Sequence, residues 1–156
     1  MSERLLHFIW RFQYFNKGHL TTTSGEPIQV IYPGIYNNDQ GPDFFNAKIN
    51  IAHTLWAGTV ELHIKSSDWK RHRHGQDSNY SNVILHVVWE DDSPAAGLPK
   101  AGAIPVLELK SRVPKFLLHR YEELMNAISF IPCEKMAYTV KDIIWTSWKD
   151  RLLAER

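Results

Sequence analysis

Three apolar-rich runs follow one another in the first two thirds of the chain, and they constrain the fold more than any other feature. They span Phe44–Ile51, Thr59–Lys65 and Val83–Trp89. Runs of this length, rich in β-branched and aromatic residues, are typical of strands. The few residues around His53 that separate the first two runs predict an antiparallel hairpin. The third run is almost entirely apolar, so we predict a central strand that is buried on both faces.

Weaker patterns complete the predicted architecture. Short strands are expected at Ile28–Tyr32 and Ala103–Lys110. Apolar residues at helical spacing indicate a helix over Ser2–Asn16, another after Pro114, and a third that Thr139 caps. We therefore predict an α/β (α+β) fold with a mixed, mainly antiparallel sheet of about five strands and flanking helices.

Length sets limits on the domain organisation. At 156 residues one domain is expected, with residues 1–135 as the α/β core and residues 136–156 as a C-terminal helix. This helix reaches Arg156 without a cap, so we expect it to lead into a further region that is absent from the chain. Cys133 is the only cysteine, which excludes an intrachain disulfide.

Charge and hydropathy narrow the range of partners and compartments. The net charge of +1 gives no general attraction to nucleic acid, so any such binding requires a local patch. No run of about 18 apolar residues occurs, so no membrane span is expected. The N-terminus lacks the apolar core and the cleavage site of a signal peptide. We therefore expect a cytoplasmic protein.

Residue types that bind metals and move protons occupy one face of the second apolar run. Half-buried strands usually expose bland residues, but here Glu61, His63 and Lys65 alternate with apolar residues and share the polar face. In the predicted hairpin, Glu61 lies opposite roughly residues 44–46, and Asp43 is diagonally adjacent to it. The stretch around this hairpin is therefore the expected functional centre.

Six segments of the sequence carry a resemblance to a known family. They are LLHFIWRFQYFN, GPDFFNAKI, LWAGTVELHIKSSDW, NVILHVVWEDD, IPVLELK and FIPCEK. Together they resemble a bacterial family of unknown function, domain of unknown function 2851, over essentially the whole chain. Members of that family are typically longer, in line with a further region beyond Arg156. The family name implies no activity, so the chemistry has to be argued from the residues.

A second resemblance, to the PD-(D/E)XK nuclease superfamily, rests on two short motifs. The pair PD at residues 42–43 is followed by ELH at residues 61–63, with seventeen residues between the two acids. The order helix, strand, PD-strand and ExH-strand matches that superfamily and implies a restriction-endonuclease-like core. His63 stands where the superfamily has Lys, and Lys65 could take over that role. The connection Ser66–Asn82 is short for the full helix that the superfamily places there.

These motifs predict a metal-dependent nuclease-like or phosphodiesterase-like domain that acts on nucleic acid. Asp43 and Glu61, from adjacent strands, could bind Mg²⁺ or Mn²⁺, which would activate water against a phosphodiester. His63 or Lys65 would orient that water or stabilise the developing charge. The residues predicted to contact nucleic acid are Lys70, Arg71, Arg73 and Trp69. On a simpler reading, Asp43 begins a turn and Glu61 is a solvated strand residue.

Two alternatives stay open. One is a transition-metal site, with Zn²⁺ as the leading ion, built from the histidines and one acid of the same region. Its candidate ligands are His63, His72, His74, and Asp77 or His86. If residues 72–74 are extended, the two outer rings point the same way. The other alternative is a non-catalytic binding or scaffold domain, in which Asp43, Glu61 and His63 do not converge and His86 is a core histidine bonded to backbone.

Overall fold

The computed structural model describes residues 1–93, 103–126, 128, 131 and 134–155. The chain divides into two compact units, the sheet unit Met1–Pro114 and the helical unit Lys115–Arg156. The first unit ends at Pro114, whereas the sequence prediction extended the core to residue 135. Cys133 lies outside the described residues.

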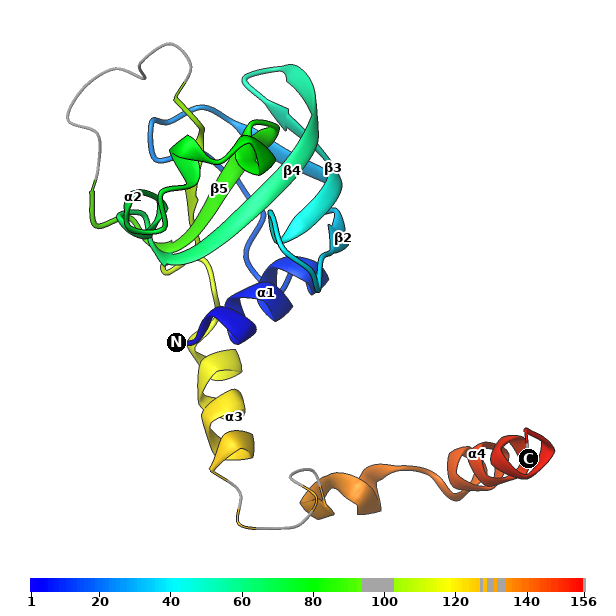
Figure 1. Ribbon diagram of the computed structural model, residues 1–156. Coiled ribbons are helices and arrows are strands. Elements are labelled where there is room, and N and C mark those ends of the chain that lie inside the picture. The colour runs from blue at the N-terminus through cyan, green and yellow to red at the C-terminus, as the bar shows by residue number, and fades with distance from the viewer. Residues whose placement is uncertain (94–102, 127, 129–130, 132–133, 156) are drawn as a thin grey trace. The chain divides into compact units, whose positions relative to one another are not determined.

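Within the described residues, the sheet unit contains a six-stranded mixed sheet (Figure 1). Its strands are β1 (Ile28–Tyr32), β2 (Ile35–Tyr36), β3 (Phe44–Ile51), β4 (Thr54–Lys65), β5 (Val83–Glu90) and β6 (Val106–Glu108). The spatial order is β1-β3-β4-β5-β6, with β2 beside β3. The pairings of β3 are antiparallel, whereas β4, β5 and β6 run parallel to one another. The predicted α+β class with a mixed, mainly antiparallel sheet is confirmed.

β3 and β4 form the hairpin that the sequence indicated. Ala52 and His53 make its two-residue loop with positive φ angles of 48° and 67°, the conformation of tight turns that match the twist of the flanking strands. Ile51 pairs with Thr54 directly beside the loop. β4 is long enough to carry Glu61 back alongside the beginning of β3.

A β-bulge in β3 sets the position of Asp43. The register of the hairpin shifts between Phe44 and Ala47, so that β3 contains one residue more than the partner strand. Asn46 lies within this bulge with φ of 56°, a conformation that Asn tolerates better than most residues. Beyond the bulge, Asp43 lies directly opposite Glu61 instead of diagonally adjacent, as a regular hairpin would have placed it.

The first helix supports β4 from its apolar face. α1 (Glu3–Phe12) begins after Ser2, whose Oγ atom accepts a hydrogen bond from the backbone N–H of Leu5 at 3.3 Å. The helix packs against β4. Its buried face comprises Leu5, Leu6, Ile9 and Trp10. Phe8 and Phe12, which the helical spacing placed on the same stripe as Leu5 and Ile9, are instead exposed.

In the middle of β4, from residue 58 to residue 63, both faces are buried, including the polar one. Val60 and Leu62 belong to the apolar core. Glu61 and His63 point to the opposite face, yet they are only 5% and 2% exposed. The sequence reading of a solvated polar face was therefore wrong, because the connection between β4 and β5 covers it.

This connection folds into three short helical segments. They are α2 (Asp68–Arg71) and the 3-10 turns η1 (His74–Gln76) and η2 (Ser78–Tyr80). The chain then enters β5, which is buried over most of its length, as predicted for a central parallel strand. A helix of four residues stands where the PD-(D/E)XK resemblance implies a full one. The expected restriction-endonuclease-like core is therefore not confirmed.

The helical unit contains α3 (Lys115–Met125), the 3-10 turn η3 (Glu134–Thr139) and α4 (Asp142–Ala154). Thr139 does not cap α4 as predicted: its hydroxyl donates to the carbonyl of Met136 at 2.7 Å, and Lys141 is the N-cap residue. In the described part of the chain, no helix has the length and apolarity that crossing a lipid bilayer requires.

Candidate metal centre

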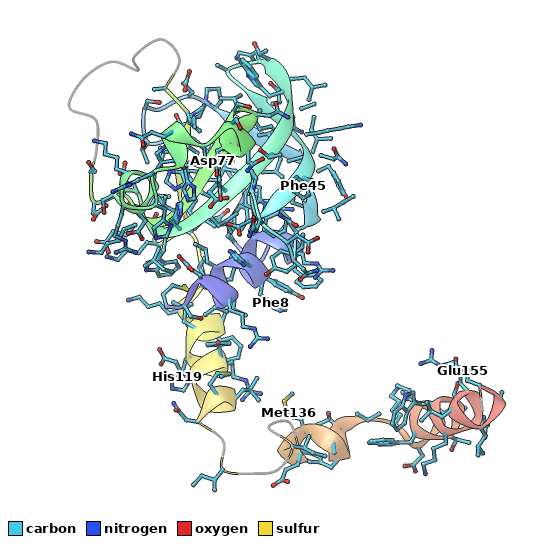
Figure 2. All side chains as sticks on the ribbon, in the orientation of Figure 1. Phe8, Phe45, Asp77, His119, Met136 and Glu155 are labelled. Atoms are coloured by element: carbon cyan, nitrogen blue, oxygen red, sulfur yellow. The ribbon has the colours of Figure 1, made fainter. Side chains whose placement is uncertain are left out.

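Two histidines of the β4–β5 connection lie over the polar face of β4. His72 follows the last residue of α2, and His74 begins η1. Both rings contact the ring of His63, with centroid distances of 5.0 Å and 5.2 Å. Figure 2 shows the side chains of this region, with Asp77 of the same connection labelled. Short helical turns therefore bring together residues that neighbouring strands alone would not.

The cluster of His63, His72 and His74 (the histidine cluster) has the spacing of a metal site. Each residue offers one ring nitrogen, and these atoms all lie within 4.8 Å of one another. The Nε2 atom of His63 is 3.2 Å from Nδ1 of His72. Ligand atoms about 2.0–2.1 Å from a tetrahedral Zn²⁺ are about 3.3 Å apart. The three histidines could therefore hold a metal ion.

A carboxyl group completes the cluster. The Oε1 atom of Glu61 lies 3.6 Å from Nε2 of His63 and 3.4 Å from Nε2 of His74. These distances also match the edge of a small coordination polyhedron. Glu61 faces two of the three histidines, so it is placed either as a further ligand or as a base beside the ion.

His86 orients the central histidine from the neighbouring strand. Its Nε2 atom lies 2.8 Å from Nδ1 of His63. If His63 uses Nε2 for a metal, its proton sits on Nδ1 and is donated to His86. The His86 ring is therefore not bonded to backbone, as the simplest interpretation of the sequence had it. In this arrangement His86 supports the metal ligand His63 and is not itself a ligand.

Burial determines the charges in the cluster. Burial, with the nearby carboxylate of Asp43 as the second cause, raises the pKa of Glu61 to about 8. Burial, reinforced by the neighbouring imidazoles, lowers the pKa of His63 to about 3 and that of His86 to about 4. The pKa of His74 is also lowered, chiefly by burial. The imidazoles are therefore neutral at pH 7, which is the form that binds metals.

One ring nitrogen has no hydrogen bond to satisfy it. Among the described residues, Nε2 of His74 is buried and makes none, although Glu61 Oε1 lies nearby. Buried polar atoms in folded proteins are rarely left in this state. A metal ion bound to this nitrogen would satisfy it, and the donor set of the cluster therefore fits a transition metal.

The predicted pair of carboxylates is brought together, but not as a shared ligand pair. The backbone N–H of Asp43 donates to Oε2 of Glu61 at 3.2 Å. The Oδ2 atom of Asp43 accepts the backbone N–H of Leu62 at 2.8 Å and lies 3.3 Å from Nε2 of His7. Asp43 thus fixes the orientation of Glu61. His7 was not among the predicted site residues, because its place in α1 gave no sequence signal of this contact.

The remaining predicted residues lie around the cluster rather than in it. Lys65 Nζ lies 3.8 Å from Asp92 at the end of β4. Trp69 packs edge-on against the rings of His63 and His74 instead of standing free in solvent. Asp77 is exposed and accepts the N–H of Asn79. The predicted phosphate-binding side chains are exposed on and just after α2: Lys70, Arg71 and Arg73.

The backbone around Arg73 explains how both flanking histidines reach the cluster. Arg73 has φ of 59°, in the left-handed region that non-glycine residues seldom adopt. Residues 72–74 consequently form a sharp turn, so the two rings converge by a route other than the extended segment considered from the sequence. The turn costs about 1–2 kcal/mol of local strain, and such strain is concentrated at functional sites.

Fold and site together define a class: a mixed α+β domain with a cluster of three histidines beside its sheet, two of them buried, that could hold a metal ion. The chain belongs to the family described as Protein of unknown function (DUF2851), which matches residues 3–156. The resemblance drawn from the six sequence segments is thereby confirmed. No curated protein and no solved structure matches the chain.

Proposed function

We propose that the sheet unit is a metal-dependent hydrolase domain in which the histidine cluster binds a transition metal ion, with Zn²⁺ as the first candidate. The observation that carries this proposal is the convergence of three imidazole nitrogens, which lie within 4.8 Å of one another, and one buried carboxyl oxygen 3.4–3.6 Å from two of these histidines. Three histidines are a ligand set that leaves one position of Zn²⁺ open for water or substrate.

The surrounding residues are suited to hydrolysis. Zn²⁺ in this place would lower the pKa of a bound water and polarise a substrate oxygen. Glu61, once a bound cation favours its carboxylate form, would be the group to accept a proton from that water, because its Oε1 atom faces His63 and His74 while the backbone N–H of Asp43 donates to Oε2. His86 keeps the Nε2 atom of His63 directed at the cluster.

A phosphodiester is the proposed substrate, with nucleic acid as the proposed partner. His72 is the exposed member of the histidine cluster, so a substrate reaches the metal from its side. Arg71 and Arg73 flank His72 in the chain, and both are exposed next to Lys70. Cationic side chains in such a position pair with phosphate oxygens.

The leading prediction from the sequence, Mg²⁺ or Mn²⁺ held between Asp43 and Glu61, has less support than the histidine site. One oxygen of each carboxyl group already has a partner: Oδ2 of Asp43 accepts the N–H of Leu62, and Oε2 of Glu61 accepts the N–H of Asp43. Hard divalent cations need several free oxygen ligands. Nitrogen donors predominate around the cluster, and these favour Zn²⁺.

Calorimetric titration of the full chain with Zn²⁺ and Mn²⁺ tests which of these metal ions the protein binds. We expect wild type to prefer Zn²⁺, and His63→Ala to weaken Zn²⁺ binding at least about 100-fold. The matched control is His119→Ala, an exposed histidine of α3, which should bind as wild type does. If Mn²⁺ binds instead, and Asp43→Asn abolishes its binding while His72→Ala does not, the two-carboxylate site replaces the one proposed.

An activity assay distinguishes a catalytic metal ion from a structural one. The zinc-loaded chain should hydrolyse bis(p-nitrophenyl) phosphate or a mixed nucleic-acid substrate. Glu61→Gln should still bind Zn²⁺ but lose most of this activity, since the amide cannot accept the proton. Zinc binding without hydrolysis of any phosphodiester would identify a structural metal centre. No metal binding at all would leave the non-catalytic binding or scaffold domain.

A further inference from the structure

A cleft adjoins the histidine cluster and is not used by the proposed chemistry. It has a volume of about 770 Å³, within the range of sites that bind small molecules. His74 and His86 form one side of it, so the cleft is continuous with the candidate metal centre. Residues that lead into β6, Ile104 among them, also line the cleft.

The walls of the cleft suit a flat apolar group. Trp69 and Tyr80 contribute aromatic surface, and their rings meet edge to face at a centroid distance of 6.0 Å. Val83 and Ile104 add aliphatic surface. The ring of Tyr80 also lies against the ring of His74, with centroids 3.9 Å apart. A planar ring in this cleft would therefore lie against aromatic surface and close to the metal.

The rim supplies hydrogen-bonding groups without positive charge. Gln76 and Ser78 line the cleft, and no described lining residue is Lys or Arg. Asp77 is the acid among the described lining residues. With one acid and no described Lys or Arg along its lining, the cleft disfavours an anionic group.

A different surface is suited to binding anionic groups. Arg71 and Arg73 do not line the cleft, although they neighbour His72, the exposed member of the histidine cluster. The site therefore has two distinct parts: a cationic approach beside His72, and an aromatic cleft without described cationic side chains beside His74. A substrate that uses both carries a phosphate and a neutral ring.

We propose that the cleft binds an uncharged planar ring of nucleobase type, so that the substrate of the site is a phosphodiester with a nucleobase close to the scissile group. This inference rests on the proposed function and specifies its substrate. The ring packs beside Trp69 and Tyr80, and its polar edge forms hydrogen bonds with Gln76 and Ser78. Stacking of this kind is tolerant of base identity.

Binding of neutral nucleosides to the full chain tests the proposal independently of turnover. Adenosine and uridine are titrated into zinc-loaded and EDTA-treated protein by calorimetry or NMR. We expect a dissociation constant at or below about 1 mM in at least the zinc-loaded state. Tyr80→Ala should weaken this binding about 5- to 150-fold, as loss of a stacking ring does, whereas Tyr80→Phe should retain it.

Two further variants keep the test clear if Tyr80→Ala disturbs His74. Ile104→Trp fills the cleft without removing a wall and should also abolish nucleoside binding. Arg71→Ala, outside the cleft, should leave it unchanged. The proposal is overturned if neither nucleoside binds, if Ile104→Trp binds as wild type does, or if inorganic phosphate displaces adenosine. Nucleoside binding without zinc binding would refute the proposed function but leave the cleft assignment intact.

Discussion

Two carboxyl groups near β4 have opposite environments. Glu61, in the middle of the strand, is buried, faces neutral imidazoles, and has a pKa raised to about 8, mainly by burial. Asp92, which follows the end of β5, is exposed and lies beside Lys65 at the end of β4. It accepts the N–H of Ser67 at 3.0 Å and its hydroxyl at 2.9 Å. These hydrogen bonds hold the pKa of Asp92 below its usual value.

The difference separates a structural cluster of charges from a functional one. Asp92 is stabilised by groups that the chain itself supplies: a backbone N–H, hydroxyls and an ammonium group. Glu61 receives one backbone hydrogen bond and otherwise faces two imidazoles that burial keeps neutral. A cation from solution would therefore change the energetics of the Glu61 region and leave the Asp92 region almost untouched. Four predictions test this contrast.

The largest effect is expected from zinc itself. At a free zinc concentration about 1,000 times the dissociation constant, a ligand that binds only the folded state stabilises it by about 4 kcal/mol. The midpoint temperature of thermal unfolding of the full chain should therefore rise on adding Zn²⁺ and fall back to its original value on adding EDTA. His63→Ala should abolish the shift, whereas the control His119→Ala should retain it. An equal shift in His63→Ala would place the metal elsewhere in the chain.

The next effect concerns Glu61 in metal-free, EDTA-treated protein. Its pKa in the folded state, about 8, lies above the ordinary value of 4.5. The unfolded chain therefore loses this proton first, and the free energy of unfolding falls as pH rises from about 4.5 to 8. Glu61→Gln should remove this loss, so that above pH 8 the variant is more stable than wild type by an amount on the order of a few kcal/mol.

Denaturant unfolding at several pH values measures this difference. The gain should shrink toward pH 4.5, because Glu61 is then protonated in both states. His63 and His86, whose pKa values are lowered to about 3 and 4, work in the opposite sense and reduce stability as pH falls below about 6.5. A metal-free Glu61→Gln variant that is less stable than wild type at pH 8 would contradict the contrast with Asp92.

A smaller effect is expected when the support behind the cluster is removed. His86→Leu deletes the acceptor for Nδ1 of His63 but replaces it with a side chain of similar size. Loss of such a partner typically weakens metal affinity 10- to 100-fold, or about 1.4–2.7 kcal/mol. Zinc titration of the variant measures it. Unchanged affinity would mean that packing alone orients His63.

Local sequence patterns were sufficient to predict most of the sheet. The apolar runs coincide closely with β3, β4 and β5, because alternation and uninterrupted burial are properties of consecutive residues. The same patterns placed Asp43 and Glu61 on neighbouring strands. They could not place them directly opposite each other, since that depends on the bulge at Asn46.

The candidate site was harder to predict because tertiary contacts create it. Alternation identified Glu61 and His63 as one face, but nothing local indicated that the β4–β5 connection would bury them. Arg73 adopts a left-handed conformation without being glycine or asparagine, so the turn that directs His72 and His74 inward carried no sequence signal. The histidines were therefore recognised as candidate ligands, while their convergence became visible only in the structure.

The smallest effect is expected at the other end of β4. Lys65→Ala removes the ammonium group that lies 3.8 Å from Asp92, but both side chains are solvent-accessible and Asp92 keeps its hydrogen bonds to Ser67. Exposed ion pairs contribute about 0–1 kcal/mol. The free energy of unfolding, measured with denaturant, should therefore change by less than about 0.5 kcal/mol. The zinc affinity should stay as in wild type. Loss of zinc binding in Lys65→Ala would show that the two clusters are coupled, and would return Lys65 to the catalytic role that the sequence suggested.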